Sequence, residues 1–157
     1  MVQPLVVEQS LEIPVSPDTA FRGTLAMDAP TVFRRWHGPF PPIKQVLDQT
    51  GDWESVGQTR TLTLVGGGGM REELASVDPS RSFGYPLSDV KGAMSLLVNR
   101  VQGEWTFEPS VAGTKVTWRW TVHPVSALAA PALPVLGRLW HGYARKGLDE
   151  LSGQEAR

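Results

Sequence analysis

Residues 98–123, VNRVQGEWTFEPSVAGTKVTWRWTVH, are predicted to form two long strands, about Val98 to Glu108 and Thr114 to His123, joined by a turn from Pro109 to Gly113. Apolar and polar residues alternate along both strands. One face carries Val101, Gly103, Trp105, Phe107, Val116, Trp118, Trp120 and Val122, and the other carries Gln102, Glu104, Thr106, Glu108, Lys115, Thr117, Arg119 and Thr121. The second face is suited to water, whereas the first requires an apolar partner.

A helix near the C-terminus is the partner that the sequence offers. After Pro124 the apolar period changes to 3.6 residues, which predicts a helix from Ala132 to Leu151. Its apolar stripe comprises Leu133, Leu136, Trp140, Gly147, Leu148 and Leu151. A helix is roughly 10–12 Å wide, narrower than a sheet of about six strands. We therefore expect the sheet to curl around the helix and to leave a pocket between them.

The N-terminal part is predicted to contain one strand and two short helices. The strand covers Leu5 to Val15, and Ser16 caps a helix that runs from Asp18 to about Ala26, with Pro17 at its first position. A second helix is predicted over Thr31 to Trp36. The proline-rich segment Pro39 to Pro42 is expected to be a stiff rim or lid rather than core.

The middle of the chain is predicted to be almost entirely β from Trp53 onward. The strands Gln58 to Val65 and Met70 to Val77 form a hairpin around the turn Gly66 to Gly69. A further strand, Arg81 to Leu87, places Phe83, Tyr85 and Leu87 on one face, and Ser88 to Met94 is expected to be a loop. A run of strands followed by one long helix indicates an α+β fold with a curved antiparallel sheet.

Composition excludes several classes of function. The 157 residues include 15 basic and 16 acidic side chains. Because basic residues are not in excess, nucleic-acid binding is not expected. The chain has no cysteine, which removes thiol chemistry and disulfides. The longest apolar stretch, Ala127 to Leu136, is interrupted by Pro131 and Pro134 and is too short to span a membrane. With no signal peptide recognisable, we expect a cytoplasmic protein with one domain over residues 1–157.

Three polar residues are candidates for chemistry in the pocket. Arg60 shares strand parity with Leu62 and Leu64, and Glu72 shares parity with Met70 and Leu74, so both are expected to point inward. Two interpretations stand: a structural ion pair at the pocket mouth, or a pair that orients a ligand oxygen while Glu72 abstracts a proton. Tyr85 adds a phenol that can donate a hydrogen bond to the ligand.

Aromatic residues are candidates for ligand contact. The residues expected to line the pocket are Trp105, Trp118, Trp120, Trp140, Phe83, Met70 and His141, and each aromatic has packing in the core as its alternative role. His141 is also a candidate acid or base, against the plainer interpretation of an ordinary helix histidine. His37, His123 and His141 lack ligand spacing, so we expect no metal site.

Six segments of the chain match a known family pattern: SPDTAF at 16–21, WESVGQTR at 53–60, MREEL at 70–74, VDP at 77–79, GEWTFEP at 103–109 and GTKVTW at 113–118. Together they resemble the START-like superfamily (SRPBCC, the birch-pollen-allergen and helix-grip proteins), and within it the bacterial polyketide cyclase/dehydrase branch. The resemblance covers nearly the whole chain. Its motifs mark turns and strands rather than a shared catalytic set.

The resemblance implies a helix-grip fold that binds a small, mostly apolar ligand as a monomer or homodimer. A cyclase/dehydratase-like role would use Arg60 to anchor an oxygen and Glu72 or Tyr85 to move a proton, with a polyketide-like chain as substrate and no cofactor. The alternative is a non-catalytic carrier or sensor of a lipid or other hydrophobic metabolite. A third interpretation is an interaction module with a collapsed cavity.

Overall fold

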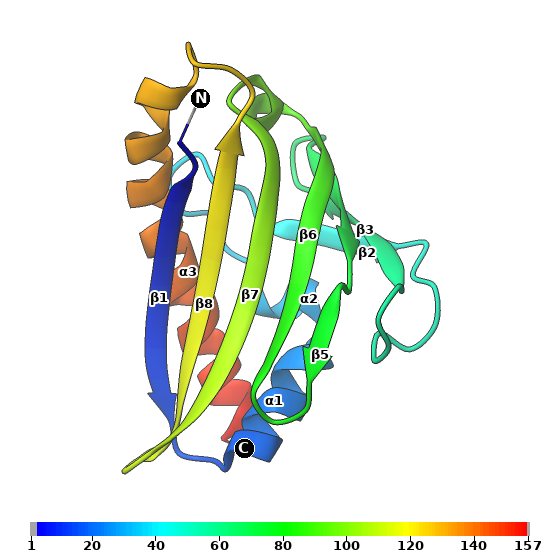
Figure 1. The fold of residues 1–157 in the computed structure, drawn as a ribbon, viewed down its shortest axis with the longest axis vertical. Coiled ribbons are helices and arrows are strands. Elements are labelled where there is room, and N and C mark those ends of the chain that lie inside the picture. Colours follow the sequence, from blue (N-terminus) through cyan, green and yellow to red (C-terminus); the bar gives the residue numbers. More distant parts are fainter. Residues whose placement is uncertain (1–2, 157) are drawn as a thin grey trace.

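In the computed structural model, which describes residues 3–156, eight strands form one antiparallel sheet that curves around a long C-terminal helix (Figure 1). The elements in chain order are β1 (Leu5–Ile13), α1 (Pro17–Leu25), α2 (Ala29–Val32), β2 (Ile43–Leu47), β3 (Thr59–Leu64), β4 (Gly69–Glu73), β5 (Ser76–Asp78), β6 (Ser82–Lys91), the 3₁₀ helix η1 (Ala93–Leu96), β7 (Val98–Ser110), β8 (Gly113–Pro124), the 3₁₀ helix η2 (Ala130–Ala132) and α3 (Leu133–Glu155). This is the α+β, helix-grip architecture that the sequence predicts.

The strand order is β1-β8-β7-β6-β4-β3-β2, with β5 paired to β6 beside this path. Strands β7 and β8 are paired along almost their whole length, and Trp105 lies opposite Trp118. Both residues are buried, as is Trp120, so the predicted alternation is confirmed. The hairpin is tighter than predicted, because pairing continues to Ser110 and Gly113 and leaves only two residues in the turn.

Helix α3 packs its apolar stripe against the concave face of the sheet. The buried residues of the helix are Leu133, Gly137, Trp140, Tyr143, Ala144, Gly147, Leu148 and Leu151. Gly137 allows close approach to β1, since a Cβ atom there would lie 3.1 Å from Leu5 and 3.2 Å from Val7. The predicted helix is therefore confirmed, although it extends to Glu155 and Leu136 is only partly buried.

Helix α1 closes one end of the curved sheet. Ser16 caps it by accepting a hydrogen bond from the Thr19 backbone N–H at 3.2 Å. Phe21 packs edge-on against Phe107, with ring centroids 5.6 Å apart, and against Phe83 at 6.0 Å. The cap that the sequence indicates thus places an aromatic plug at the end of the core.

Helix α2 is shorter than predicted. It covers Ala29–Val32 instead of Thr31 to Trp36. Phe33 leaves the helical conformation and packs against Tyr143, with stacked rings 5.4 Å apart, and against Trp118 at 5.1 Å. Burial of Phe33 against helix α3 outweighs continuation of the local helix.

Three strand boundaries also differ from the prediction. Strand β2 was not predicted, because this five-residue edge strand is only partly buried and alternates weakly. The expected strand Met70 to Val77 divides into β4, which pairs with both β3 and β6, and β5, which pairs with β6. The segment from Ser88 is not a loop, because β6 continues to Lys91, which pairs with Gly69. The sheet is therefore wider than the six strands expected.

The proline-rich segment before β2 is also more than a rim. Phe40 is buried, and its ring centroid lies 5.1 Å from that of Tyr143. The expectation that this segment lies outside the core is wrong for Phe40, because that ring packs on Tyr143 of helix α3.

Among residues 3–156, no helix combines the length and the apolar character that crossing a bilayer requires.

A half-buried carboxyl group joins the last turn of α3 to α1. Thr24 Oγ1 donates a hydrogen bond to Glu155 Oε1 at 2.8 Å, and the buried Glu155 Oε2 has no partner within residues 3–156. Burial raises the pKa of Glu155 to about 7, against a smaller opposing effect of the Thr24 hydrogen bond. The folded state therefore holds a proton at a pH where the unfolded state has lost it.

We expect this proton to make stability depend on pH. As pH rises from the ordinary value of 4.5 to about 7, the unfolded state binds fewer protons than the folded state, so the free energy of unfolding should fall. Glu155→Gln should abolish this decrease, measured by urea unfolding across that range. The exposed Glu108→Gln serves as control, and an equal pH slope in wild type and Glu155→Gln would contradict the assignment.

Candidate functional site

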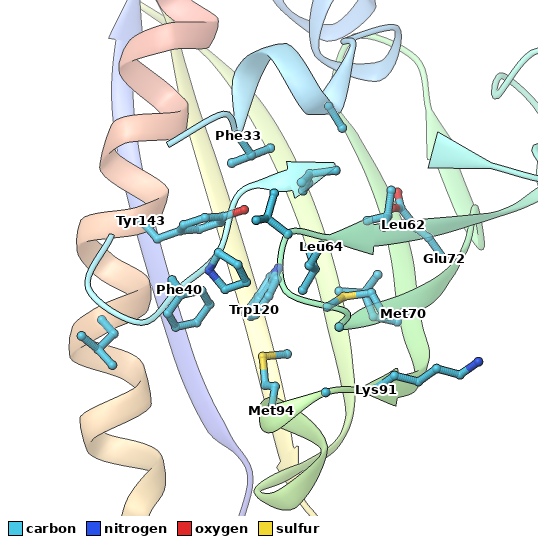
Figure 2. Close-up of a pocket in the computed structure, with 18 of the residues that line it drawn as sticks. Phe33, Phe40, Leu62, Leu64, Met70, Glu72, Lys91, Met94, Trp120 and Tyr143 are labelled. Atoms are coloured by element: carbon cyan, nitrogen blue, oxygen red, sulfur yellow. The ribbon is translucent and has the colours of Figure 1, made fainter. Parts of the chain in front are cut away.

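A cavity of about 580 Å³ lies between the concave face of the sheet and helix α3. This volume is within the range of small-molecule sites in proteins. In Figure 2, Tyr143 comes from the helix side, Phe33 and Phe40 from the segment around β2, and Met94 from η1. The opposite wall is formed by sheet residues, among them Leu62, Leu64, Met70, Glu72 and Trp120. The cavity is open in the structure, and this contradicts the collapsed-cavity interpretation.

Arg60 and Glu72 form a buried ion pair on the sheet wall. They are direct partners across β3 and β4, and Arg60 Nη2 lies 3.0 Å from Glu72 Oε1. Only 7% of the Arg60 side chain and 6% of the Glu72 side chain are exposed. The Arg60 guanidinium also lies over the Trp53 ring, 4.0 Å from its centroid. Strand parity thus correctly places both charges inside, and both line the cavity.

The ion pair retains capacity for a ligand. Arg60 Nε is buried and has no hydrogen-bond partner among the described residues. Burial raises the pKa of Glu72 above its ordinary value, while the charge and the hydrogen bond of Arg60 act in the opposite direction. A desolvated carboxylate next to a free N–H donor can accept a proton while the donor stabilises a developing oxyanion.

Tyr85 supplies a hydroxyl group near the centre of the sheet. It lies opposite Gly103 of β7, and its ring occupies the space that a Cβ atom at position 103 would need. Because Gly103 has no side chain, the Tyr85 ring crosses β7, and its Oη accepts a hydrogen bond from Trp118 Nε1 of β8. The glycine therefore positions the phenol.

Both cavity tyrosines are neutral donors at neutral pH. Burial raises the pKa of Tyr85, the charge of Glu72 raises it further, and indole N–H groups oppose the shift. Burial also raises the pKa of Tyr143, with a smaller effect of Tyr85. Figure 2 shows the Tyr143 hydroxyl directed from α3 into the cavity. A ligand oxygen can therefore meet phenol donors from the sheet and from the helix.

The indoles of the sheet form a packed aromatic wall. Trp105 and Trp118 stack with centroids 5.0 Å apart and planes at 6°, and Trp120 meets Trp118 edge-on at 5.8 Å. All three line the cavity, as do the predicted residues Phe83 and Met70. These residues are placed to contact a ring or chain in the ligand.

Two predicted residues of α3 do not line the cavity. Trp140 lies behind the indole wall, 5.1 Å from Trp118 and 5.7 Å from Trp120 between centroids. His141 lies on the β1 side, where Gln9 Nε2 donates to its Nδ1 at 2.9 Å. The prediction that these residues line the pocket is therefore wrong: His141 lies on the face of α3 toward β1, and the other indoles lie between Trp140 and the cavity.

Tyr143, Phe33 and Phe40 also line the cavity and are not among the residues predicted from the sequence. Tyr143 is three residues after Trp140 on the same helix stripe, so its spacing could have identified it. Phe33 and Phe40 come from a segment without regular periodicity, and no sequence signal indicated that they face the cavity. Within residues 3–156, no group of three or more His, Asp or Glu side chains could hold a metal ion.

Comparison with known proteins agrees with this architecture. The family model described as "Polyketide cyclase / dehydrase and lipid transport" matches residues 4–153. No curated protein matches the sequence. The superfamily resemblance noted in the sequence is thereby confirmed.

Solved structures of the same fold differ widely in sequence. Ara h 8.0201 has a TM-score of 0.72 at 15% identity, and 97% of each chain is covered. Major latex-like protein 151 from Panax ginseng has a TM-score of 0.71 at 11% identity, with 98% of each chain covered. Norcoclaurine synthase from Thalictrum flavum, in complex with dopamine and hydroxybenzaldehyde, has a TM-score of 0.68 at 17% identity, covering 98% of this chain and 87% of that chain.

Replacement of Glu72 tests the structural role of the ion pair. Glu72→Gln leaves Arg60 buried without its counter-charge, so we expect the free energy of unfolding to fall by about 3–5 kcal/mol. The double variant Arg60→Met/Glu72→Leu should recover most of that loss, because no buried charge remains. Urea unfolding measures both, with the neighbouring exposed Glu73→Gln as control. If Glu72→Gln is as stable as the wild-type protein, the Arg60–Glu72 pair does not stabilise the fold.

Proposed function

The chain belongs to the polyketide cyclase/dehydrase and lipid transport family, and we propose that it binds a small, mostly apolar molecule bearing at least one oxygen function. The observation that carries this proposal is the buried Arg60–Glu72 pair in the wall of an otherwise largely apolar cavity of about 580 Å³. The apolar walls favour a ligand with a large apolar part, because binding removes that apolar surface from water. The free Arg60 Nε and the tyrosine hydroxyls favour an acceptor oxygen on it.

In the catalytic form of this proposal, the protein closes and dehydrates a polyketide-like chain. Glu72 removes a proton from the carbon next to a carbonyl group, and Arg60 stabilises the enolate oxygen that results. The carbanion carbon forms a bond to a second carbonyl carbon, whose oxygen takes a proton from Tyr85. The proton held by Glu72 then returns to Tyr85, which restores both side chains. Loss of the new hydroxyl group together with a proton from the neighbouring carbon releases one molecule of water and completes the reaction.

The cavity contributes restraint to such a reaction. A flexible poly-carbonyl chain must adopt one fold for closure, and the indole wall with Phe33 and Phe40 limits the folds available. Catalysis has a precedent in this architecture, since one protein of the same fold is norcoclaurine synthase. Its likeness to this chain is one of fold, and the residues named above are this chain's own.

A second candidate function is a non-catalytic carrier or sensor of a hydrophobic metabolite. The pairing of the polar groups favours it, because Arg60 already bonds Glu72 and Tyr85 already bonds Trp118. In this form the same groups only orient the ligand, and no proton moves.

Tryptophan fluorescence tests ligand binding. We expect 1-anilinonaphthalene-8-sulfonate to quench it saturably, because five indoles line the cavity, those of Trp36, Trp53, Trp105, Trp118 and Trp120. Leu62→Phe/Leu64→Phe narrows the cavity and should weaken binding about tenfold, or about 1.4 kcal/mol. Val111→Phe, at the exposed β7–β8 turn, should bind as wild type does. Equal affinity in all three proteins would place the dye outside the cavity.

Turnover of a linear poly-β-keto thioester separates the two candidate functions. The catalytic form predicts that wild-type protein accelerates ring closure and that Glu72→Gln, assayed where circular dichroism shows it to be folded, lowers the rate by about 10²–10⁴-fold, the usual contribution of a general base. Glu73→Gln should retain the rate. Chromatography of the products over time measures it. Saturable dye displacement by the thioester without acceleration would support the carrier and contradict the cyclase.

A further inference from the structure

Exposed apolar side chains gather at one end of the molecule. Leu96 of η1 is 75% exposed and Leu128, in the β8–α3 connection, is 93% exposed. Val125 and Val135 are exposed in the same region, and the Val125 backbone N–H donates to the Leu97 carbonyl at 2.9 Å. Figure 1 shows η1 and the β8–α3 connection together at the upper end. We call Leu96, Val125, Leu128 and Val135 the apolar end.

Charge is distributed around this end in a distinct pattern. Residues 92–99 and 124–137 contain no charged side chain. Basic residues flank these stretches: Lys91 and Arg100 enclose the first, and Arg138 follows the second, all of them exposed. Along α3 the basic residues Arg138, Arg145 and Lys146 come first, and the acids Asp149, Glu150 and Glu155 follow. The acidic residue nearest in sequence to either uncharged stretch is Asp89, two residues before Lys91.

The apolar end is continuous with the wall of the cavity. Ala93, Met94 and Leu97 from the η1 region line the cavity, and so do Ala132, Val135 and Leu136 from the start of α3. Val135 therefore belongs both to the exposed surface and to the cavity lining. Figure 2 shows Met94 reaching toward the cavity from η1.

We propose that the apolar end docks on the surface of an anionic lipid bilayer. Leu96, Val125, Leu128 and Val135 enter the boundary between headgroups and acyl chains, while Lys91, Arg100 and Arg138 contact the anionic headgroups. An apolar centre with basic flanks matches a surface that is both apolar and anionic. A second copy of this chain would instead bring the same basic residues into mutual repulsion.

Docking in this orientation places the part of the cavity lining that comes from η1 and the start of α3 beside the bilayer. A hydrophobic ligand then passes between membrane and cavity without crossing water. This consequence rests on the proposed binding function, whereas the docking itself needs no ligand.

Sedimentation with lipid vesicles tests the docking. Wild-type protein should sediment with vesicles of equal parts phosphatidylcholine and phosphatidylglycerol, less with phosphatidylcholine alone, and less at high salt. Leu96→Asp/Leu128→Asp should weaken vesicle binding by about tenfold or more, because two charges replace two inserted apolar groups. Val111→Asp at the opposite end of the sheet is the control and should bind as wild type does. Thermal unfolding by circular dichroism verifies that each variant is folded.

Three outcomes would overturn the proposal. They are absence of wild-type binding to either vesicle, equal loss in the Val111→Asp control, and a wild-type dimer in sedimentation velocity that Leu96→Asp/Leu128→Asp dissolves without any vesicle binding. Quenching by 1-anilinonaphthalene-8-sulfonate separates this proposal from cavity binding. For the wild-type protein, quenching without vesicle binding would contradict the docking proposal only, and vesicle binding without quenching would contradict the cavity proposal only.

Discussion

The mismatch in width between a broad apolar sheet and one covering helix determines most of this structure. The concave face needs an apolar partner along its whole breadth, but α3 packs mainly near β1 and β8, where Trp118, Trp120 and Trp140 close together. On the other side of these indoles the sheet curves away from α3, and shorter segments cover the rest of its concave face. Phe21 plugs one end, and Phe33 and Phe40 reach in from the chain around α2 and β2. The cavity is the volume that these partial covers leave unfilled.

The polar site depends on the same sheet. Arg60 and Glu72 face inward because they are direct cross-strand partners with apolar neighbours at alternate positions. Tyr85 reaches Trp118 only because Gly103 lies between their strands. Each chemical group is thus set by strand register, and a shift of one residue would turn these groups toward water. Fold and site therefore share one constraint.

Strand parity and helix period predicted much of this arrangement. The indoles at 105, 118 and 120 and the pair Arg60 and Glu72 were placed correctly, because alternation determines which face a strand residue occupies. Helix periodicity does not show which residues of the apolar stripe of α3 reach the cavity and which are covered by other side chains. Trp140 lies behind other indoles, and Tyr143 reaches the cavity from the same stripe. Phe33, Phe40 and β2 depend on long-range packing, for which the local sequence has no period.

The stacked pair Trp105 and Trp118 has an optical consequence. Two indoles with centroids 5.0 Å apart and planes at 6° have strongly interacting transition dipoles, and burial in a rigid wall fixes their relative orientation. Exciton coupling between them should therefore appear in the ultraviolet circular dichroism of the folded protein. The cavity wall thus contains an intrinsic chromophore pair, whose signal reports small movements of β7 against β8 without any added label.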